Sequence, residues 1–180
     1  MFKFRSTLTA SLLGLGLLVT ACGRDPQDPG TVTPTPPPNK CGSCATYEVC
    51  VAATGMCGIN PSSTWFFAVE SARIALTKST GESWDALGGA PDPFVMLDAR
   101  QTTTKQDTFT PLWQEGATYT AATLTGAGVS LTVFDSDLAS NDLIGGPSIV
   151  RFTEADLRRG TVTISKLGQV DSLLLSVSPR

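Results

Sequence analysis

The chain has 180 residues, with 13 Lys and Arg against 16 Asp and Glu, a formal net charge of −3 and no histidine. The acidic balance argues against a nucleic-acid partner, because binding to phosphates needs a basic surface. The absence of histidine excludes Ser-His-Asp and Cys-His catalysis and every His-ligated metal site.

The start of the chain has the layout of a bacterial export signal. Lys3 and Arg5 precede an apolar run from Leu8 to Val19, which is shorter than the roughly 20 apolar residues that span a bilayer. The run ends in the segment Leu18-Val19-Thr20-Ala21-Cys22, which resembles the lipobox of bacterial lipoproteins. This resemblance implies cleavage before Cys22, a diacylglyceryl group on its sulfur and a further acyl chain on its new amine. The alternative is an ordinary secretory signal in which Cys22 is incidental.

The anchor predicted at Cys22 places the protein in the cell envelope. Gly23 follows the cysteine, where an Asp is the usual signal for retention in the inner membrane, so we expect the outer membrane. The domain would then be periplasmic or surface-exposed. Without residues 1–21 the chain carries 11 basic and 16 acidic residues, a net charge of −5, which gives no broad attraction to anionic lipid.

Two short segments follow the predicted anchor. Residues 22–40 contain six prolines and little apolar bulk, which predicts an extended linker of about 3.1 Å per residue. Residues 41–58 resemble the small Cys-rich knots found near the start of many bacterial lipoproteins, and we interpret them as a disulfide-stapled spacer. The sequence does not choose among the three possible pairings, and a four-thiolate zinc site is the alternative. The four cysteines are Cys41, Cys44, Cys50 and Cys57.

Residues 60–180 predict a single all-β domain. Short runs in which apolar residues alternate with Ser and Thr, such as Val129–Phe134, are typical of half-buried strands. The alternation changes phase near Glu70 within the run from Trp65 to Leu76, which predicts a β-bulge. We expect about eight strands and one helix, at Phe152–Arg159. Many short strands without βαβ spacing indicate an antiparallel sandwich or barrel.

Acidic residues gather in two loops of this domain, and neither loop contains Lys or Arg. If the loops meet, neighbouring carboxylates repel one another, and protonation or a cation must relieve the repulsion. Calcium accepts six to eight oxygen ligands and suits such a cluster, whereas magnesium keeps more of its waters. The first loop contains Asp85 and Asp92, and the second contains Asp135, Asp137 and Asp142.

Four further motifs lie along this domain. They are Val69-Glu70-Ser71-Ala72-Arg73-Ile74, Asp92-Pro93-Phe94-Val95-Met96-Leu97, Asp107 to Glu115 with its Pro111-Leu112-Trp113 centre, and Leu131 to Asp137 followed by Asp142-Leu143-Ile144-Gly145. These motifs resemble those of the C2 domain of protein kinase C and synaptotagmin, in the order in which they occur there. The resemblance implies an eight-stranded antiparallel sandwich with its calcium loops together at one end.

The five acids match the positions of calcium ligands in the family's motifs, so the resemblance implies that all five bind calcium. The spacing between Asp137 and Asp142 is one residue shorter than is common in the family, and Asn141 could take the place of Asp142. The resemblance also places Leu87 and Leu138 at loop tips that contact membranes. Phosphoinositide binding is not expected, because Lys105 stands without a basic run around it.

We therefore predict a membrane-anchored lipoprotein with a calcium-binding C2-like domain. Calcium would let the domain engage phospholipid or a protein partner. The alternative is a structural envelope protein in which calcium only stabilises the loops. We expect no enzymatic activity, because no nucleophile or cofactor motif accompanies the acids.

Overall fold

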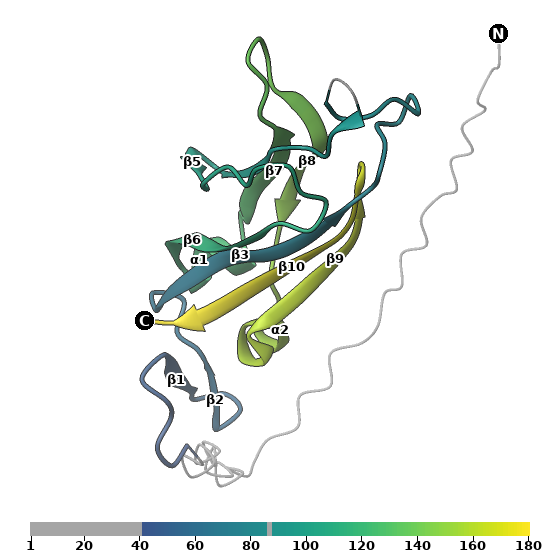
Figure 1. Cartoon of the computed structure of the whole chain (residues 1–180). Coiled ribbons are helices and arrows are strands. Elements are labelled where there is room, and N and C mark those ends of the chain that lie inside the picture. The colour runs from purple at the N-terminus through teal and green to yellow at the C-terminus, as the bar shows by residue number, and fades with distance from the viewer. Residues whose placement is uncertain (1–40, 86–87) are drawn as a thin grey trace, which may run out of the picture. The chain divides into compact units, whose positions relative to one another are not determined.

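The computed structural model describes residues 41–85 and 88–180 (Figure 1). All the described residues belong to one compact unit. The predictions made for the export signal, for Cys22 and for the linker fall on residues outside the described ranges. No helix among the described residues is both long and apolar enough to cross a membrane.

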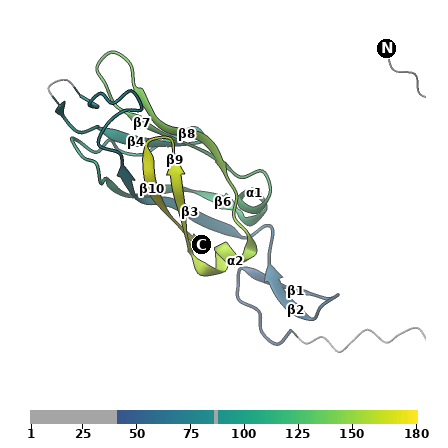
Figure 2. The same ribbon diagram turned by 90° about the vertical axis from the view of Figure 1, so that its right-hand side faces the viewer.

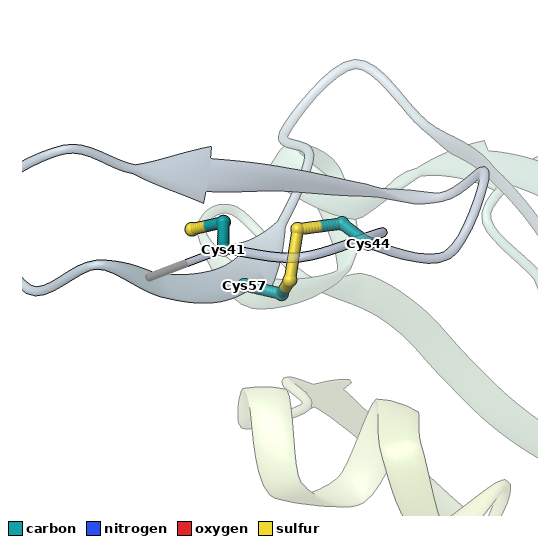
Figure 3. Close-up of side chains that lie close together, drawn as sticks. All are labelled: Cys41, Cys44 and Cys57. Carbon is teal, nitrogen blue, oxygen red and sulfur yellow. A yellow bond between two sulfur atoms is a disulfide. The ribbon is translucent and has the colours of Figure 1, made fainter. Parts of the chain in front are cut away.

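The Cys-rich segment forms a hairpin of two short antiparallel strands, β1 (Glu48–Val51) and β2 (Met56–Ile59). Two disulfides staple the segment, Cys41–Cys50 and Cys44–Cys57. Figure 3 shows the Cys44–Cys57 bond with the Cys41 side chain close by. The predicted disulfides are present, and the structure selects one of the three pairings. All four sulfurs are bonded in pairs, so none is a thiolate that could bind zinc.

Eight further strands form two four-stranded antiparallel sheets, as predicted for a C2-like sandwich. The first sheet has the order β6-β3-β10-β9 and the second has the order β5-β4-β7-β8. The strands of the first sheet are β3 (Thr64–Ile74), β6 (Leu112–Thr120), β9 (Thr161–Leu167) and β10 (Val170–Pro179). The strands of the second are β4 (Pro93–Leu97), β5 (Arg100–Gln101), β7 (Val129–Asp135) and β8 (Asp142–Val150).

The core lies between the two sheets and follows the predicted alternation. On β7, every second residue from Val129 to Asp135 is buried. On β10, Leu173, Leu175 and Val177 are buried. Side chains of one parity point to one face of a strand, so these positions fill the space between the sheets. The bulkiest fully buried side chains are Trp65, Phe67, Leu97, Leu124, Leu131, Ile144, Leu173 and Leu175.

The predicted change of phase in the first strand is a β-bulge. The pairing between β3 and β10 shifts register between Leu174 and Leu175, which pair with Ser71 and Val69, so Glu70 is the extra residue on β3. Beyond the bulge Ile74 is buried, as its parity predicts, but Leu76 lies past the end of β3 and is exposed. The prediction that Leu76 belongs to this strand is therefore wrong.

Two short helices connect strands. The predicted helix is α2 (Glu154–Arg159), which begins at Thr153 with a capping box completed by Asp156. It ends at Gly160, whose φ of 79° is a left-handed conformation that glycine adopts readily. The other helix, α1 (Ala121–Thr125), is a single turn that the sequence analysis missed.

The acidic loops and the Cys-rich hairpin lie at opposite ends of this unit. Figures 1 and 2 both show the β7–β8 loop near one end, with β1, β2 and α2 towards the other. Arg158 on α2 fixes the hairpin to the sandwich by donating hydrogen bonds to Glu48 and to the carbonyl oxygen of Cys57. The ring of Tyr47 packs edge-on against Trp65 with centroids 5.2 Å apart.

Candidate metal centre

Asp135 is the innermost residue of the acidic loops. It follows Val129, Leu131 and Val133 on the inward-facing side of β7, and its side chain is 0% exposed. One carboxylate oxygen, Oδ1, accepts a hydrogen bond of 2.6 Å from the backbone N–H of Asp92. The other, Oδ2, is buried and has no hydrogen-bond partner among the described residues. A buried acceptor without a partner carries a free-energy cost, so this oxygen indicates that the site is built for a ligand.

The electrostatic surroundings of Asp135 oppose its ionisation. Burial raises the pKa of Asp135 to about 6, the hydrogen bond from Asp92 lowers it, and the charges of Asp137, Asp85 and Asp92 raise it. Burial also raises the pKa of Asp85, and the charges of Asp92 and Asp137 act in the same direction. The carboxylates therefore destabilise one another when no cation is near.

The two acidic loops meet, as the cation hypothesis requires. One carboxylate oxygen from each of Asp85, Asp135 and Asp137 lies within 4.8 Å of the others. Asp85 and Asp137 border an open cleft of about 580 Å³. Its lining residues are Lys78, Asp85, Asp92, Ser136, Asp137, Leu138, Ala139, Ser140 and Asp142.

Asp92 lines the same cleft but also holds a neighbouring loop. Its Oδ1 accepts a hydrogen bond of 2.6 Å from the backbone N–H of Asp107. The Oδ1 of Asp107 in turn accepts a 3.0 Å bond from the N–H of Ala90. Asp92 lies outside the group of three that converge most closely, and its role as a ligand stays a prediction.

Asp142 is the first residue of β8 and pairs in register with Asp135. Its carboxylate accepts a hydrogen bond from the ammonium group of Lys78. This bond raises the pKa of Lys78, so the ammonium stays charged at neutral pH. The Oδ1 of Asn141, considered as a replacement ligand, accepts a 3.3 Å bond from the backbone N–H of Asp137 and so helps to hold the loop.

Lys78 is a feature of the site that the sequence analysis missed. It lies seven residues before Asp85, outside the stretch between Asp85 and Asp92 that was treated as the loop. No motif marks it, and only the path of the chain brings it beside Asp142. The observation that the acidic loops lack a basic residue is correct for those stretches, but the cleft they form does contain one.

The predicted membrane-contact residues and Lys105 are placed as follows. Leu138 is fully exposed at the β7–β8 loop, on the lining of the cleft. Leu87 lies outside the described residues. Lys105 forms an ion pair with Glu115 at 3.3 Å.

The donor set suits a hard cation. Three converging carboxylates, one of them with an unpartnered buried oxygen, offer only oxygen atoms, and oxygen-only sites favour calcium or magnesium over softer metals. A cation held there would neutralise the repulsion among these carboxylates.

Comparisons with known proteins find similar solved structures, whereas no curated protein matches the chain. A structure of the two C2 domains of extended synaptotagmin 2 aligns at 16% identity and a TM-score of 0.47, over 67% of this chain and 42% of that one. The match thus spans less than half the length of that structure. A structure titled as a C2 domain aligns at 17% identity and a TM-score of 0.46, over 65% of this chain and 97% of that one. Human GIVD cytosolic phospholipase A2 aligns at 21% identity and a TM-score of 0.46, over 67% of this chain and 17% of that one.

The sequence profile of the C2 domain matches residues 70–165, which is more than half of the chain. This range includes both acidic loops and most of the sandwich strands. The chain therefore belongs to the C2 domain family.

Proposed function

We propose that this chain is a lipid-anchored envelope protein whose C2 domain binds calcium and thereby engages phospholipid or a protein partner. The buried Oδ2 of Asp135, unpartnered and beside the carboxylates of Asp85 and Asp137, is the observation that supports it most directly. A cation would give that oxygen the partner it lacks and would neutralise the repulsion among the three acids. The proposal includes no catalytic step.

The five predicted acids would contribute unequally. Asp85, Asp135 and Asp137 are already close enough to share an ion. Asp92 lines the cleft and would add the carboxylate oxygen that does not bind the Asp107 backbone. Bound calcium would supply a positive centre with open positions for phosphate or carboxylate oxygens of a partner.

The surface beside the cleft supports contact with an apolar partner. Leu138 is fully exposed next to Ser136 and Asp137 on the cleft lining. A single exposed leucine is common on protein surfaces, so Leu138 alone would carry no argument. Its position beside the proposed cation site is what suits it to a bilayer, where headgroup phosphates lie next to apolar chains.

The positions of the hairpin and the cleft bear on which surface is contacted. The chain enters the sandwich through the Cys-rich hairpin, and the β7–β8 loop, whose residues line the cleft, lies at the other end (Figure 2). If Cys22 carries the anchor, this arrangement favours contact between the cleft and a surface other than the one that holds the anchor. We propose the outer membrane as its location because Gly23, and not Asp, follows Cys22.

Calcium binding is tested by thermal melting of the purified full chain in a nonionic detergent, with chelator and with millimolar calcium. We expect a higher melting temperature with calcium, because a ligand that binds only the folded state stabilises it. The Asp137→Asn variant should lose most of this shift, and Asp171→Asn, an exposed acid on β10, should keep it. An unchanged melting temperature of the native chain would contradict calcium binding.

The membrane contact is tested with two populations of vesicles. The full chain is reconstituted into phosphatidylcholine vesicles, which are then mixed with protein-free vesicles containing phosphatidylserine. Calcium should cluster the two populations, as measured by light scattering, and Leu138→Glu should abolish clustering while keeping calcium stabilisation. Calcium stabilisation without clustering by the native chain would favour the alternative in which calcium only rigidifies the loops.

A further inference from the structure

Lys78 gives the acidic cleft an internal positive charge. Among the described residues that line the cleft, it is the one cationic side chain. Its ammonium group bonds the carboxylate of Asp142, and the charges of Asp137 and Asp135 also act on it. The carboxylates of the cleft are therefore partly neutralised before any ion arrives.

The backbone around Lys78 fixes where its side chain begins. The N–H of Lys78 donates to the carbonyl oxygen of Glu82 at 2.8 Å, and the N–H of Gly81 donates to the carbonyl oxygen of Lys78 at 3.0 Å. Gly81 has a φ of 87°, a left-handed backbone conformation that residues other than glycine rarely adopt. This closed turn sets the position of Lys78 at the rim of the cleft.

An aromatic ring supports the ammonium from a second direction. The Nζ of Lys78 lies 5.8 Å from the ring centroid of Trp84, within the range of a cation–π interaction. The ring is itself buried and fixed, because its Nε1–H donates to the carbonyl oxygen of Ala75 at 2.8 Å. The side chain of Lys78 is only 26% exposed. Its place in the cleft is therefore a built feature of the fold.

We propose that Lys78 is an intramolecular counter-ion that competes with calcium for Asp142 and so sets the calcium affinity of the cleft. This inference rests on the proposed calcium site. Asp142 can contribute to a bound cation only when its bond to the ammonium is given up, and an ammonium left beside a dication would repel it. Lys78 thus weakens calcium binding relative to an otherwise identical cleft without a lysine.

The structure also offers the displaced ammonium another position. Lys78 and Asp142 together border a second cleft, of about 320 Å³, on whose lining Glu82 and Thr80 lie. The carboxylate of Glu82 there accepts a hydrogen bond of 2.9 Å from the hydroxyl of Thr80 and has capacity for a further donor. If the lysine side chain rotates towards Glu82, the ammonium gains Glu82 as its partner and Asp142 is free to bind the calcium ion.

Calcium titration of the full chain in detergent, by isothermal calorimetry, tests the proposal. Lys78→Met keeps the length and apolar bulk of the side chain but removes its charge. We expect it to bind calcium about tenfold more tightly than the native chain, or about 1.4 kcal/mol. The matched control is Lys105→Met, because Lys105 is also paired with a carboxylate and is 29% exposed, but it does not line the cleft. Lys105→Met should leave the calcium affinity unchanged. Lys78→Arg, which keeps the positive charge, should bind calcium within a few fold of the native affinity.

The outcomes separate this inference from the proposed function. Equal affinities in the native chain and Lys78→Met would overturn the competition and leave the calcium site standing. Binding by Lys78→Met alone would support the competition and reject calcium as a ligand of the native chain. Binding by neither would overturn both. Lys78→Gln provides a second uncharged variant if circular dichroism shows that Lys78→Met does not fold.

Discussion

Replacing Asp135 by Asn should stabilise the calcium-free protein at neutral pH. The amide oxygen of Asn can still accept the bond from the N–H of Asp92. The amide nitrogen would stand where Oδ2 is now buried without a partner, close to the carboxylates of Asp85 and Asp137. The substitution keeps the shape of the side chain, removes a buried charge and supplies a donor to its acidic neighbours.

The size of the effect follows from the pKa of Asp135. Burial raises this pKa to about 6 from an ordinary value of 3.8. Between these two pH values the folded state holds a proton that the unfolded state has lost, so stability falls as the pH rises through this window. At 1.36 kcal/mol per pH unit, the loss is about 3 kcal/mol and is complete above the folded-state pKa. The side chain of the Asn variant has no proton to lose, so this variant avoids that loss of stability.

Thermal melts in chelator at pH 4.5 and 7.5 measure this difference. At pH 7.5 the Asp135→Asn variant should melt above the native chain, by up to roughly 6–12 °C for about 3 kcal/mol. At pH 4.5 the gap should be much smaller, because the native Asp135 is then mostly protonated in the folded state. The exposed control Asp171→Asn should show no such pH-dependent gap. In millimolar calcium the native chain should melt above the Asp135→Asn variant, since the native carboxylate then has a cation as its partner.

A melting temperature of Asp135→Asn at or below that of the native chain, in chelator at pH 7.5, would refute this reasoning. It would mean that the ionised carboxylate is stabilised by its surroundings without any cation. The unpartnered oxygen would then no longer support a metal site.

Two further predictions concern the hairpin and the sandwich. The double variant Cys44→Ser with Cys57→Ser should lose up to about 3 kcal/mol, the loop-closure value for a loop near 15 residues, and hydrogen exchange should show the loss mainly in β2. Equal exchange rates in β2 would contradict a stapling role for this bond. Gly145→Ala should destabilise the domain by about 1–3 kcal/mol in urea unfolding, because its Cβ would lie 2.1 Å from the carbonyl oxygen of Leu167. An unchanged unfolding midpoint would show that β8 and β9 separate there at little cost.

The strands were predictable because alternation reports burial directly. Val129 to Asp135 alternates in the sequence and in its exposure, and the phase change near Glu70 marks the bulge of β3 against β10. The single turn of α1 was missed because five residues give no helical period to detect. The cysteine pairing was open because it depends on how the hairpin folds back, which spacing alone does not specify.

The site was predictable where its residues share a loop with a motif. Asp135 is the last residue of β7 and Asp137 lies just beyond it, and the structure brings them to Asp85. Their roles as ligands stay predictions. Lys78 could not be found in this way, because the turn from Lys78 to Glu82 and the ring of Trp84 place it in the cleft. Long-range placement of a charge depends on tertiary packing and leaves no periodic trace in the sequence.

The position of β10 has a consequence for how the domain is made. This strand comes last in the sandwich, yet it lies in the interior of its sheet, between β3 and β9. Its register pairs Pro179 with Trp65, so the first and last sandwich strands must meet across more than a hundred residues. Such distant pairing is slow to form. A chain that is still emerging from a ribosome exposes the open edges of β3 and β9 until β10 arrives. The sandwich is therefore completed only after β10 has emerged, with unpaired strand edges as the main hazard during that delay.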